Sequence, residues 1–66
     1  MQLVINGEAR TVPDPSSVEE LLRHLALDPR AVVVELNRVI IRRPAIASTT
    51  LAENDNVEIV HFVGGG

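Results

Sequence analysis

Residues 1–25 read MQLVINGEARTVPDPSSVEELLRHL, and this stretch predicts a β-hairpin followed by one amphipathic helix. Residues 3–5 form a short β-prone run. Asn6-Gly7 comes next and is the strongest two-residue hairpin signal, because both central positions of a type I′ turn need a positive φ. Residues 9–12 are the expected return strand. The prolines that follow end the sheet pairing, since proline supplies no N–H to a ladder.

Two serines mark the start of the predicted helix. Ser16 and Ser17 each have a glutamate three residues later, which is a doubled capping-box pattern. Apolar side chains then recur at i, i+3, i+4 and i+7 and form one helical face: Val18, Leu21, Leu22 and Leu25. Pro29 prevents the helix from running on. One apolar face on a short helix indicates that the helix packs across a sheet.

The remaining sequence predicts three more strands. Residues 31–36 are rich in β-branched side chains, residues 39–41 form a short strand after a polar turn, and residues 57–63 form the last strand. Residues 44–51 are compatible with an irregular connection or with one helical turn. The order hairpin, helix, strand, short strand, strand predicts an α+β fold, in which one main helix lies across a mixed sheet of four to five strands.

Strand alternation assigns side chains to the two faces of this sheet. The charges of Glu35 and Glu58 mark the wet face. The predicted core consists of Leu3, Ile5, Val18, Leu21, Leu22, Leu25, Val32, Val34, Leu36, Val57 and Ile59. Four apolar residues share the wet face: Val4, Val33, Val60 and Phe62. They are either scattered surface residues or, as we predict, one patch that binds a partner protein.

The composition excludes several classes of function. The 66 residues contain no cysteine, so thiol nucleophiles, disulfides and zinc-thiolate sites are excluded. The net charge of −3 and the single aromatic residue argue against nucleic-acid binding. No apolar run approaches the roughly 20 residues that span a bilayer, and the first residues do not resemble a signal peptide. We therefore expect a cytoplasmic protein without nucleic-acid or membrane partners.

Nothing in the sequence predicts an active site. A chain of 66 residues holds one small domain, with no core left over to shape a deep pocket. His24 and His61 are the general-base candidates near neutrality, and neither belongs to a catalytic or metal-binding motif. We interpret both as structural or surface residues. No catalytic residue, bound metal or bound cofactor is expected.

Three glycines follow the last predicted strand directly: Gly64, Gly65 and Gly66. They are either a frayed terminus or a tail that enters a slot too narrow for any side chain, because glycine has no Cβ. The carboxylate of Gly66 is the only group that such a tail presents. Adenylation by ATP supplies the leaving group that a carboxylate lacks. Attack by a sulfur nucleophile would then give a thiocarboxylate, and attack by an amine would give an amide. The sequence predicts a folded domain over residues 1–63 and a flexible tail over residues 64–66.

Four segments carry a family resemblance. They are MQLVING at residues 1–7, VEELL at residues 18–22, VVVELN at residues 32–37 and DNVEIVHFVGGG at residues 55–66. Together they resemble the ThiS family of sulfur carrier proteins, in the ubiquitin-like β-grasp group, over essentially the whole chain. Two departures from the family pattern, the third terminal glycine and the Arg42-Arg43-Pro44 sequence, do not touch the chemistry.

The resemblance implies a carrier protein rather than an enzyme. An adenylating enzyme of the ThiF/MoeB type, using ATP and Mg²⁺, would convert the carboxylate of Gly66 to an acyl-adenylate, with Gly64 and Gly65 threading into its site. A cysteine desulfurase or sulfurtransferase would relay sulfur as a persulfide and leave a thiocarboxylate on Gly66. Thiazole synthase (ThiG) would take that sulfur for the thiazole ring of thiamine.

Three other functions stay open at this point. A molybdopterin-type sulfur carrier would use the same thiocarboxylate, although such carriers are usually longer and have an aromatic-proline stretch before the tail. A ubiquitin-like modifier would form isopeptides, but the absence of lysine argues against chain building on itself. In a β-grasp interaction module, the tail would be inert.

Overall fold

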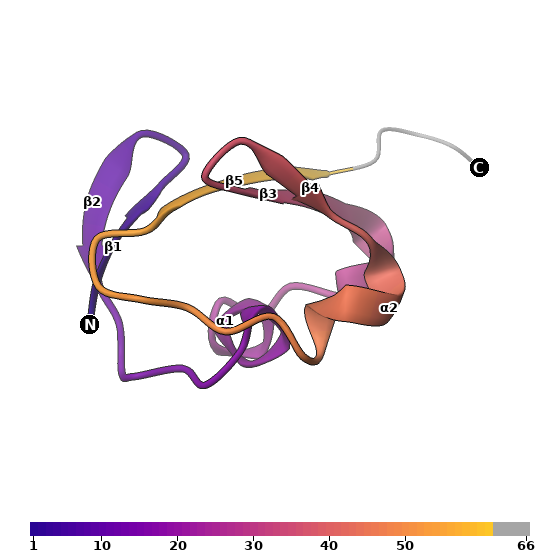
Figure 1. The fold of residues 1–66 in the computed structure, drawn as a ribbon, viewed down its shortest axis with the longest axis horizontal. Helices are drawn as coiled ribbons and strands as arrows, with labels where there is room; N and C mark the ends of the chain where they lie inside the picture. Colours follow the sequence, from indigo (N-terminus) through magenta and orange to yellow (C-terminus); the bar gives the residue numbers. More distant parts are fainter. Residues whose placement is uncertain (62–66) are drawn as a thin grey trace.

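The computed structural model describes residues 1–61. Its elements are β1 (Gln2–Ile5), β2 (Glu8–Thr11), α1 (Val18–His24), the 3₁₀-helix η1 (Pro29–Ala31), β3 (Val32–Leu36), β4 (Val39–Ile41), α2 (Arg43–Ile46) and β5 (Asn56–His61). The five strands form one sheet in the order β2-β1-β5-β3-β4. Of the strand pairs that residues 1–61 form, the β1–β5 pair alone is parallel. The helix α1 lies across one face of the sheet, as the sequence predicts (Figure 1).

Both hairpin turns adopt the left-handed backbone that a two-residue type I′ turn requires. The φ angles are 51° at Asn6 and 80° at Gly7, and 50° at Asn37 and 71° at Arg38. Asparagine tolerates this region better than other residues with a Cβ, because its short polar side chain can form local hydrogen bonds. The Asn6-Gly7 hairpin is confirmed, and the turn at Asn37 explains why β4 pairs with β3.

The two turn asparagines also hold the central strand β5. Asn6 Oδ1 accepts a hydrogen bond from the backbone N–H of Ile59 at 2.7 Å. Asn37 Oδ1 accepts one from the backbone N–H of Asn56 at 2.9 Å, and Asn37 Nδ2 donates to Asp55 Oδ1 at 3.1 Å. The two asparagine side chains therefore accept hydrogen bonds from two backbone N–H groups of β5, those of Asn56 and Ile59. Strand β5 is fixed in register along its length.

Replacement of Asn37 tests this arrangement. Asn37→Ala removes two side-chain hydrogen bonds. It also places alanine, whose side chain cannot form local hydrogen bonds, at a positive φ. The substitution should therefore lower the free energy of unfolding by about 1–3 kcal/mol. Urea unfolding followed by circular dichroism measures this loss. Asn37→Gly is the matched control, because it removes the same hydrogen bonds but relieves the backbone, and it should cost less. A glycine variant as stable as the parent would contradict the role of the side chain.

The helix α1 begins as a capped helix in which both serines have a role. Ser17 is the N-cap, and its Oγ accepts a hydrogen bond from the backbone N–H of Glu20 at 3.2 Å. The carboxylate of Glu20 reaches back to Ser16, accepting from its backbone N–H and its hydroxyl, both at 3.1 Å. Residues 44–51, which the sequence left open, contain most of the single helical turn α2.

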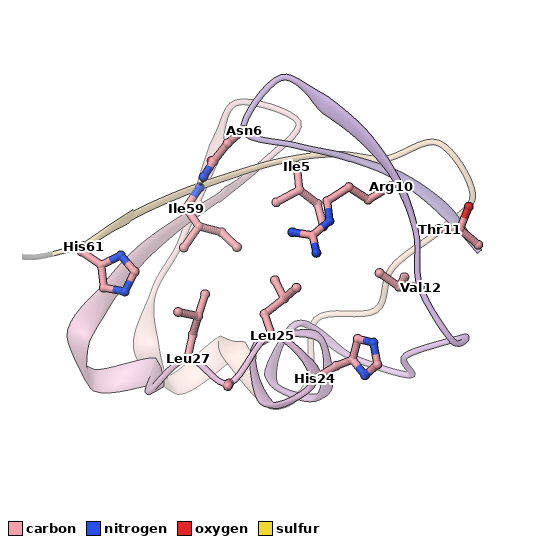
Figure 2. Close-up of a pocket in the computed structure, with 11 residues that line it drawn as sticks. Ile5, Asn6, Arg10, Thr11, Val12, His24, Leu25, Leu27, Ile59 and His61 are labelled. Atoms are coloured by element: carbon pink, nitrogen blue, oxygen red, sulfur yellow. Dashed lines mark hydrogen bonds between the residues drawn. The ribbon is translucent and has the colours of Figure 1, made fainter.

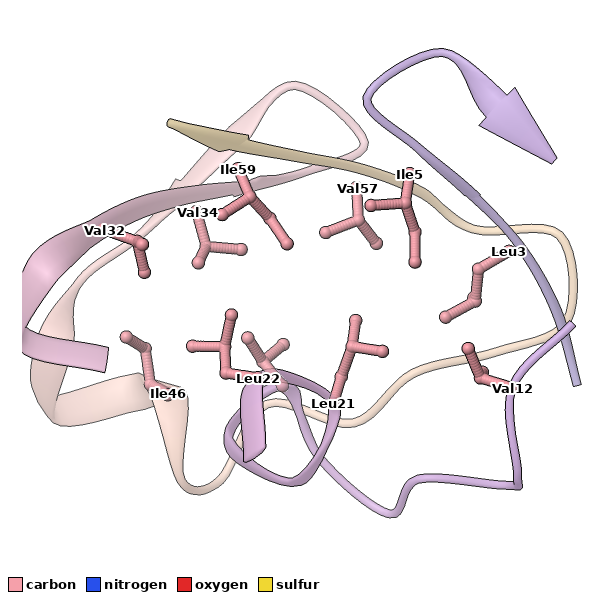
Figure 3. Close-up of a cluster of buried hydrophobic side chains, with 11 residues drawn as sticks. Leu3, Ile5, Val12, Leu21, Leu22, Val32, Val34, Ile46, Val57 and Ile59 are labelled. Carbon is pink, nitrogen blue, oxygen red and sulfur yellow. The ribbon is translucent and has the colours of Figure 1, made fainter. Parts of the chain in front are cut away.

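The core lies between α1 and the sheet (Figure 3). It comprises Leu3, Ile5, Val12, Val18, Leu21, Leu22, Val32, Val34, Ile46, Val57 and Ile59. Two predicted core residues, Leu25 and Leu36, are only partly buried and pack against its edge, because each stands at the end of its element. Val12 and Ile46 were not predicted. The backbone of Val12 exchanges hydrogen bonds with Met1, which extends the hairpin by one pair beyond β2. Alternation along this extended strand turns the side chain of Val12 to the same side of the sheet as the core.

Candidate functional site

The face of the sheet opposite α1, here called the outer face, contains the predicted partner patch. Along the antiparallel β3–β5 pair, Val33 lies directly opposite Val60 and Glu35 lies directly opposite Glu58. On the other side of β3, Glu35 lies opposite Ile40 of β4. Successive side chains of a strand point to opposite faces of the sheet, so all the residues in these pairs lie on the outer face. The outer face therefore combines apolar side chains with two adjacent carboxylates.

The register brings some of the predicted patch residues together. Val33 is half-buried and Val60 is 59% exposed, and the two side chains are cross-strand neighbours. Val4 lies elsewhere on the same face, since it pairs with Ala9 of β2 and with Asn56 at the start of β5. Phe62 lies outside the described residues. Val33 and Val60 thus form one apolar pair, and Val4 belongs to a separate row.

Ile40 is an outer-face residue that the sequence analysis did not assign. It is 61% exposed and lies opposite Glu35. The signal was present in the short strand of residues 39–41, because Ile41 pairs with inward-facing Val34 and alternation then turns Ile40 outward. With Val33 and Val60 it places apolar side chains beside the carboxylates.

The facing carboxylates of Glu35 and Glu58 are unusual for a sheet, because like charges directly opposite each other are destabilising. Within residues 1–61 the ion pairs lie elsewhere: Met1 with Asp14, Glu19 with Arg23, and Asp28 with Arg30. An arginine or lysine of a partner would relieve this repulsion. The outer face is therefore complementary to a surface that carries a basic residue among apolar ones.

Among residues 1–61, the one pair of titratable groups with shifted pKa values, Asp28 and Arg30, has a structural role. Asp28 caps η1, and its carboxylate accepts from the backbone N–H of Arg30 at 2.8 Å and from the guanidinium at 3.1 Å. The side-chain hydrogen bond from Arg30 lowers the pKa of Asp28 and raises the pKa of Arg30. This pair fixes the entry to β3 and lies apart from the carboxylates of the outer face.

The two histidines of the sequence line one cavity. His24 and His61 are exposed side chains at a cavity of about 420 Å³ between the β1–β2 hairpin, the end of α1 and β5 (Figure 2). In residues 1–61 there is no cluster of three histidine or carboxylate side chains that could hold a metal ion. No helix in the same range is long and apolar enough to cross a membrane.

The predicted carrier residues follow β5 in the sequence. Strand β5 ends at His61 in the middle of the sheet, paired with β1 on one side and β3 on the other. Gly64, Gly65 and Gly66 lie outside the described residues. The predicted carrier residues therefore follow the central strand of the sheet, whose last described residue, His61, pairs with Val32 of β3.

In a comparison with protein families, the model of the ThiS family matches residues 3–66 of this chain. The chain belongs to the ThiS family. The sulfur carrier protein ThiS of Bacillus subtilis is 37% identical over 65 residues, which cover 97% of this chain and 98% of that protein. The crystal structure of the thiamine biosynthesis protein ThiS from Geobacter metallireducens superposes with a TM-score of 0.85, at 39% identity and with 100% of both chains covered. The ubiquitin-like β-grasp fold implied by the sequence is confirmed.

Two further relatives are much longer than this ThiS-family chain. The thiazole synthase of Paramagnetospirillum magneticum is 44% identical over 66 residues, and that of Magnetococcus marinus is 36% identical over 66 residues. In both cases the match covers 100% of this chain and 20% of the relative. The chain therefore spans one fifth of the length of these two proteins.

Proposed function

We propose that this chain is a sulfur carrier protein for the thiazole moiety of thiamine, with Gly66 as the residue that carries the sulfur. The observation that supports this most strongly is the ThiS match, which continues through the last glycine. In this proposal residues 1–63 form the folded domain that the partner enzymes bind, and residues 64–66 form a flexible tail that enters their active sites. The chain contributes no catalytic side chain of its own.

The proposed chemistry takes place at one carboxylate. An adenylating enzyme of the ThiF/MoeB type joins the Gly66 carboxylate to AMP from Mg²⁺-bound ATP and releases pyrophosphate. The terminal sulfur of a cysteine persulfide, supplied by a cysteine desulfurase or sulfurtransferase, attacks the carbonyl carbon and AMP leaves. A thiol then cleaves the sulfur–sulfur bond and leaves the thiocarboxylate on Gly66. Because the chain contains no cysteine, no thiol of its own competes for the sulfur.

Thiazole synthase is the proposed acceptor of the sulfur. The support comes from the two thiazole synthases in which a segment similar to this whole chain makes up a fifth of the protein. A carrier segment in the same polypeptide as an enzyme has a high effective concentration at that enzyme. The same pairing is proposed here between this chain and ThiG.

The outer face is the proposed docking surface for the adenylating enzyme. Val33, Val60 and Ile40 supply apolar contact area, and the facing carboxylates of Glu35 and Glu58 favour a basic residue on the enzyme. Apolar contacts at the centre of an interface contribute most of the affinity, whereas charges steer the encounter and set the orientation. Phe62 and Val4 remain predicted members of this surface.

Substitution of Val60 tests the docking surface. Val60→Ser removes an exposed apolar side chain beside Val33, so it should weaken binding to the adenylating enzyme about tenfold and leave the fold intact. Val39→Ser is the matched control, because Val39 is 62% exposed and, by alternation with Ile40, does not lie on the outer face. Isothermal titration calorimetry gives both dissociation constants. Equal losses in the two variants would argue against a specific patch.

The function itself is tested by intact mass. After incubation with ATP, Mg²⁺, the adenylating enzyme and a persulfide source, the mass should rise by about 16 Da, because one oxygen is replaced by sulfur. An unchanged mass would favour an interaction module, and an isopeptide-linked product would favour a modifier. Genetic complementation separates the two carriers, since a thiamine-pathway carrier rescues a thiamine auxotroph and a molybdopterin carrier rescues a molybdenum-cofactor mutant.

A further inference from the structure

The strand β2 has a free edge that the proposed carrier function does not use. It stands last in the sheet order β2-β1-β5-β3-β4, so among the described residues 1–61 β1 is its only neighbour in the sheet. In an antiparallel pair, the residues of one strand point their backbone groups alternately at the neighbour and away from it. The phase of this alternation decides which groups of β2 face outward.

The hydrogen bonds at the start of the hairpin fix that phase. Met1 and Val12 exchange two backbone hydrogen bonds, each of 2.9 Å. Alternation then makes Leu3–Arg10 the next hydrogen-bonded pair and turns the backbone of Ala9 outward. On β1 the backbone N–H of Val4, the partner of Ala9, faces away from β2 and donates to Asp55 O at 2.9 Å, as this phase requires.

Ala9 and Thr11 therefore present their backbone N–H and C=O groups at the free edge. Within residues 1–61 none of these groups has a hydrogen-bond partner. A row of open backbone groups on an edge strand is a template for an added strand. The side chains do not block it, because Ala9 is small and both residues point to the outer face.

A cavity lies beside this edge on the helix side of the sheet. Its floor is apolar and includes Leu25 and Leu27, and its rim carries Arg10, His24 and His61 from three different elements. Figure 2 shows Arg10 reaching from β2 into the space above Leu25, with His24 and His61 at opposite sides. Arg10 belongs to none of the ion pairs within residues 1–61. The short helix α1 does not cover this inner side of β2.

The polar groups at the cavity favour a negatively charged segment as the binding partner. Arg10 and the two imidazoles provide N–H donors at the cavity, and Glu8 is the one acidic residue of β2 and stands next to the turn. A strand added beside Ala9 and Thr11 would direct alternate side chains to the helix side, next to Arg10. Glutamate fits there, because its methylenes cover the apolar floor while its carboxylate reaches the guanidinium of Arg10.

The opposite edge of the sheet is a poorer template. In β4 the pairs of Val39 with Leu36 and of Ile41 with Val34 are the hydrogen-bonded ones, since Val39 and Leu36 close a two-residue turn. Within β4, Ile40 alone turns its backbone outward. The edge of β2 offers two such residues together with a cavity.

We propose that the free edge of β2 and its cavity bind an extended acidic segment of a partner protein, which adds a sixth strand to the sheet next to β2. This surface is separate from the outer-face residues Val33 and Val60. A partner bound there would leave the outer face free for the adenylating enzyme.

The test uses a synthetic peptide of alternating valine and glutamate with blocked ends, and a matched peptide in which lysine replaces glutamate. With the full chain labelled with ¹⁵N, the glutamate peptide should shift and protect the backbone N–H of Ala9 and Thr11 from exchange. The N–H of Arg10, already bonded to β1, should stay protected in both states. Failure of the glutamate peptide to bind, or equal binding of the lysine peptide, would overturn the proposal.

Two proline variants provide the matched control. Ala9→Pro removes an outward N–H without breaking a bond to β1 and should weaken binding of the glutamate peptide at least about tenfold. Ile40→Pro removes the equivalent outward N–H on β4 and should leave the affinity unchanged. Arg10→Gln keeps the backbone intact and should weaken binding about fivefold. Equal effects of the two prolines, or no effect of Arg10→Gln in a folded protein, would contradict the assignment.

Discussion

A chain that lacks Gly66 is expected to form no thiocarboxylate, although its domain stays folded. Removal of one residue brings the terminal carboxylate back by roughly 3.5 Å along an extended chain. A misplacement of about 1 Å at a reacting atom already costs on the order of 100-fold in rate. The carboxylate of Gly65 would therefore stop short of the α-phosphate of ATP. Intact mass spectrometry after the loading reaction should show the unmodified mass only.

The control for this truncation is a variant of unchanged length. Gly66→Ala keeps the position of the carboxylate but adds a Cβ in the slot that glycine is proposed to enter, so it should load more slowly than the parent and still faster than the truncated chain. The thermal unfolding of both variants should match the parent, because the core lies within the described residues. A truncated chain that gains sulfur at the parent rate would refute the role of Gly66.

The second large effect concerns stability. Leu21→Ala is expected to lower the free energy of unfolding by about 2–5 kcal/mol, because the side chain of Leu21 is fully buried between α1 and the sheet. A domain of this length has a total stability of roughly 3–10 kcal/mol. The substitution should therefore remove a large share of that stability, lower the midpoint of urea unfolding and raise the unfolded fraction in buffer. Equilibrium urea unfolding followed by circular dichroism measures both quantities.

Leu25→Ala is the matched control for this prediction. Leu25 is on the same apolar face of the helix pattern, but it only packs against the edge of the core. Its truncation leaves a smaller void and should cost less than half as much as Leu21→Ala. Equal losses at the two positions would show that the core extends to the end of α1, contrary to the burial that separates them.

The sequence predicted the elements whose signals are local. The turn at Asn6-Gly7 and the cap at Ser17 each depend on residues within four positions of one another, and both are present in the structure. Burial of Val12 and Ile46 was missed, because it depends on what the fold places around them. Residues 44–51 stayed ambiguous for the same reason, since the short helix α2 has too few residues to show a period.

In the candidate site, too, the features that depend on the fold could not be predicted from local sequence patterns. The acidic pair of Glu35 and Glu58 joins residues that are far apart in the sequence, and only the β3–β5 register shows that they face each other. The free edge of β2 likewise follows from the strand order, which no local pattern contains. The proposed carrier role of Gly66 rests on the family resemblance, because glycines alone do not indicate which enzymes act on them.

The position of β5 has a mechanical consequence. A partner that grips the end of the chain pulls on β5, and this strand has ladder hydrogen bonds on both sides, to β1 and to β3. Force along the strand therefore loads in shear the ladder to β3, which runs from Val57 to His61, and the shorter ladder to β1 at Asn56 and Val57. The side chains of Asn6 and Asn37 add two further attachments to the same strand. In the proposed function, partner enzymes that hold the chain end would therefore pull on a strand that is paired on both of its sides.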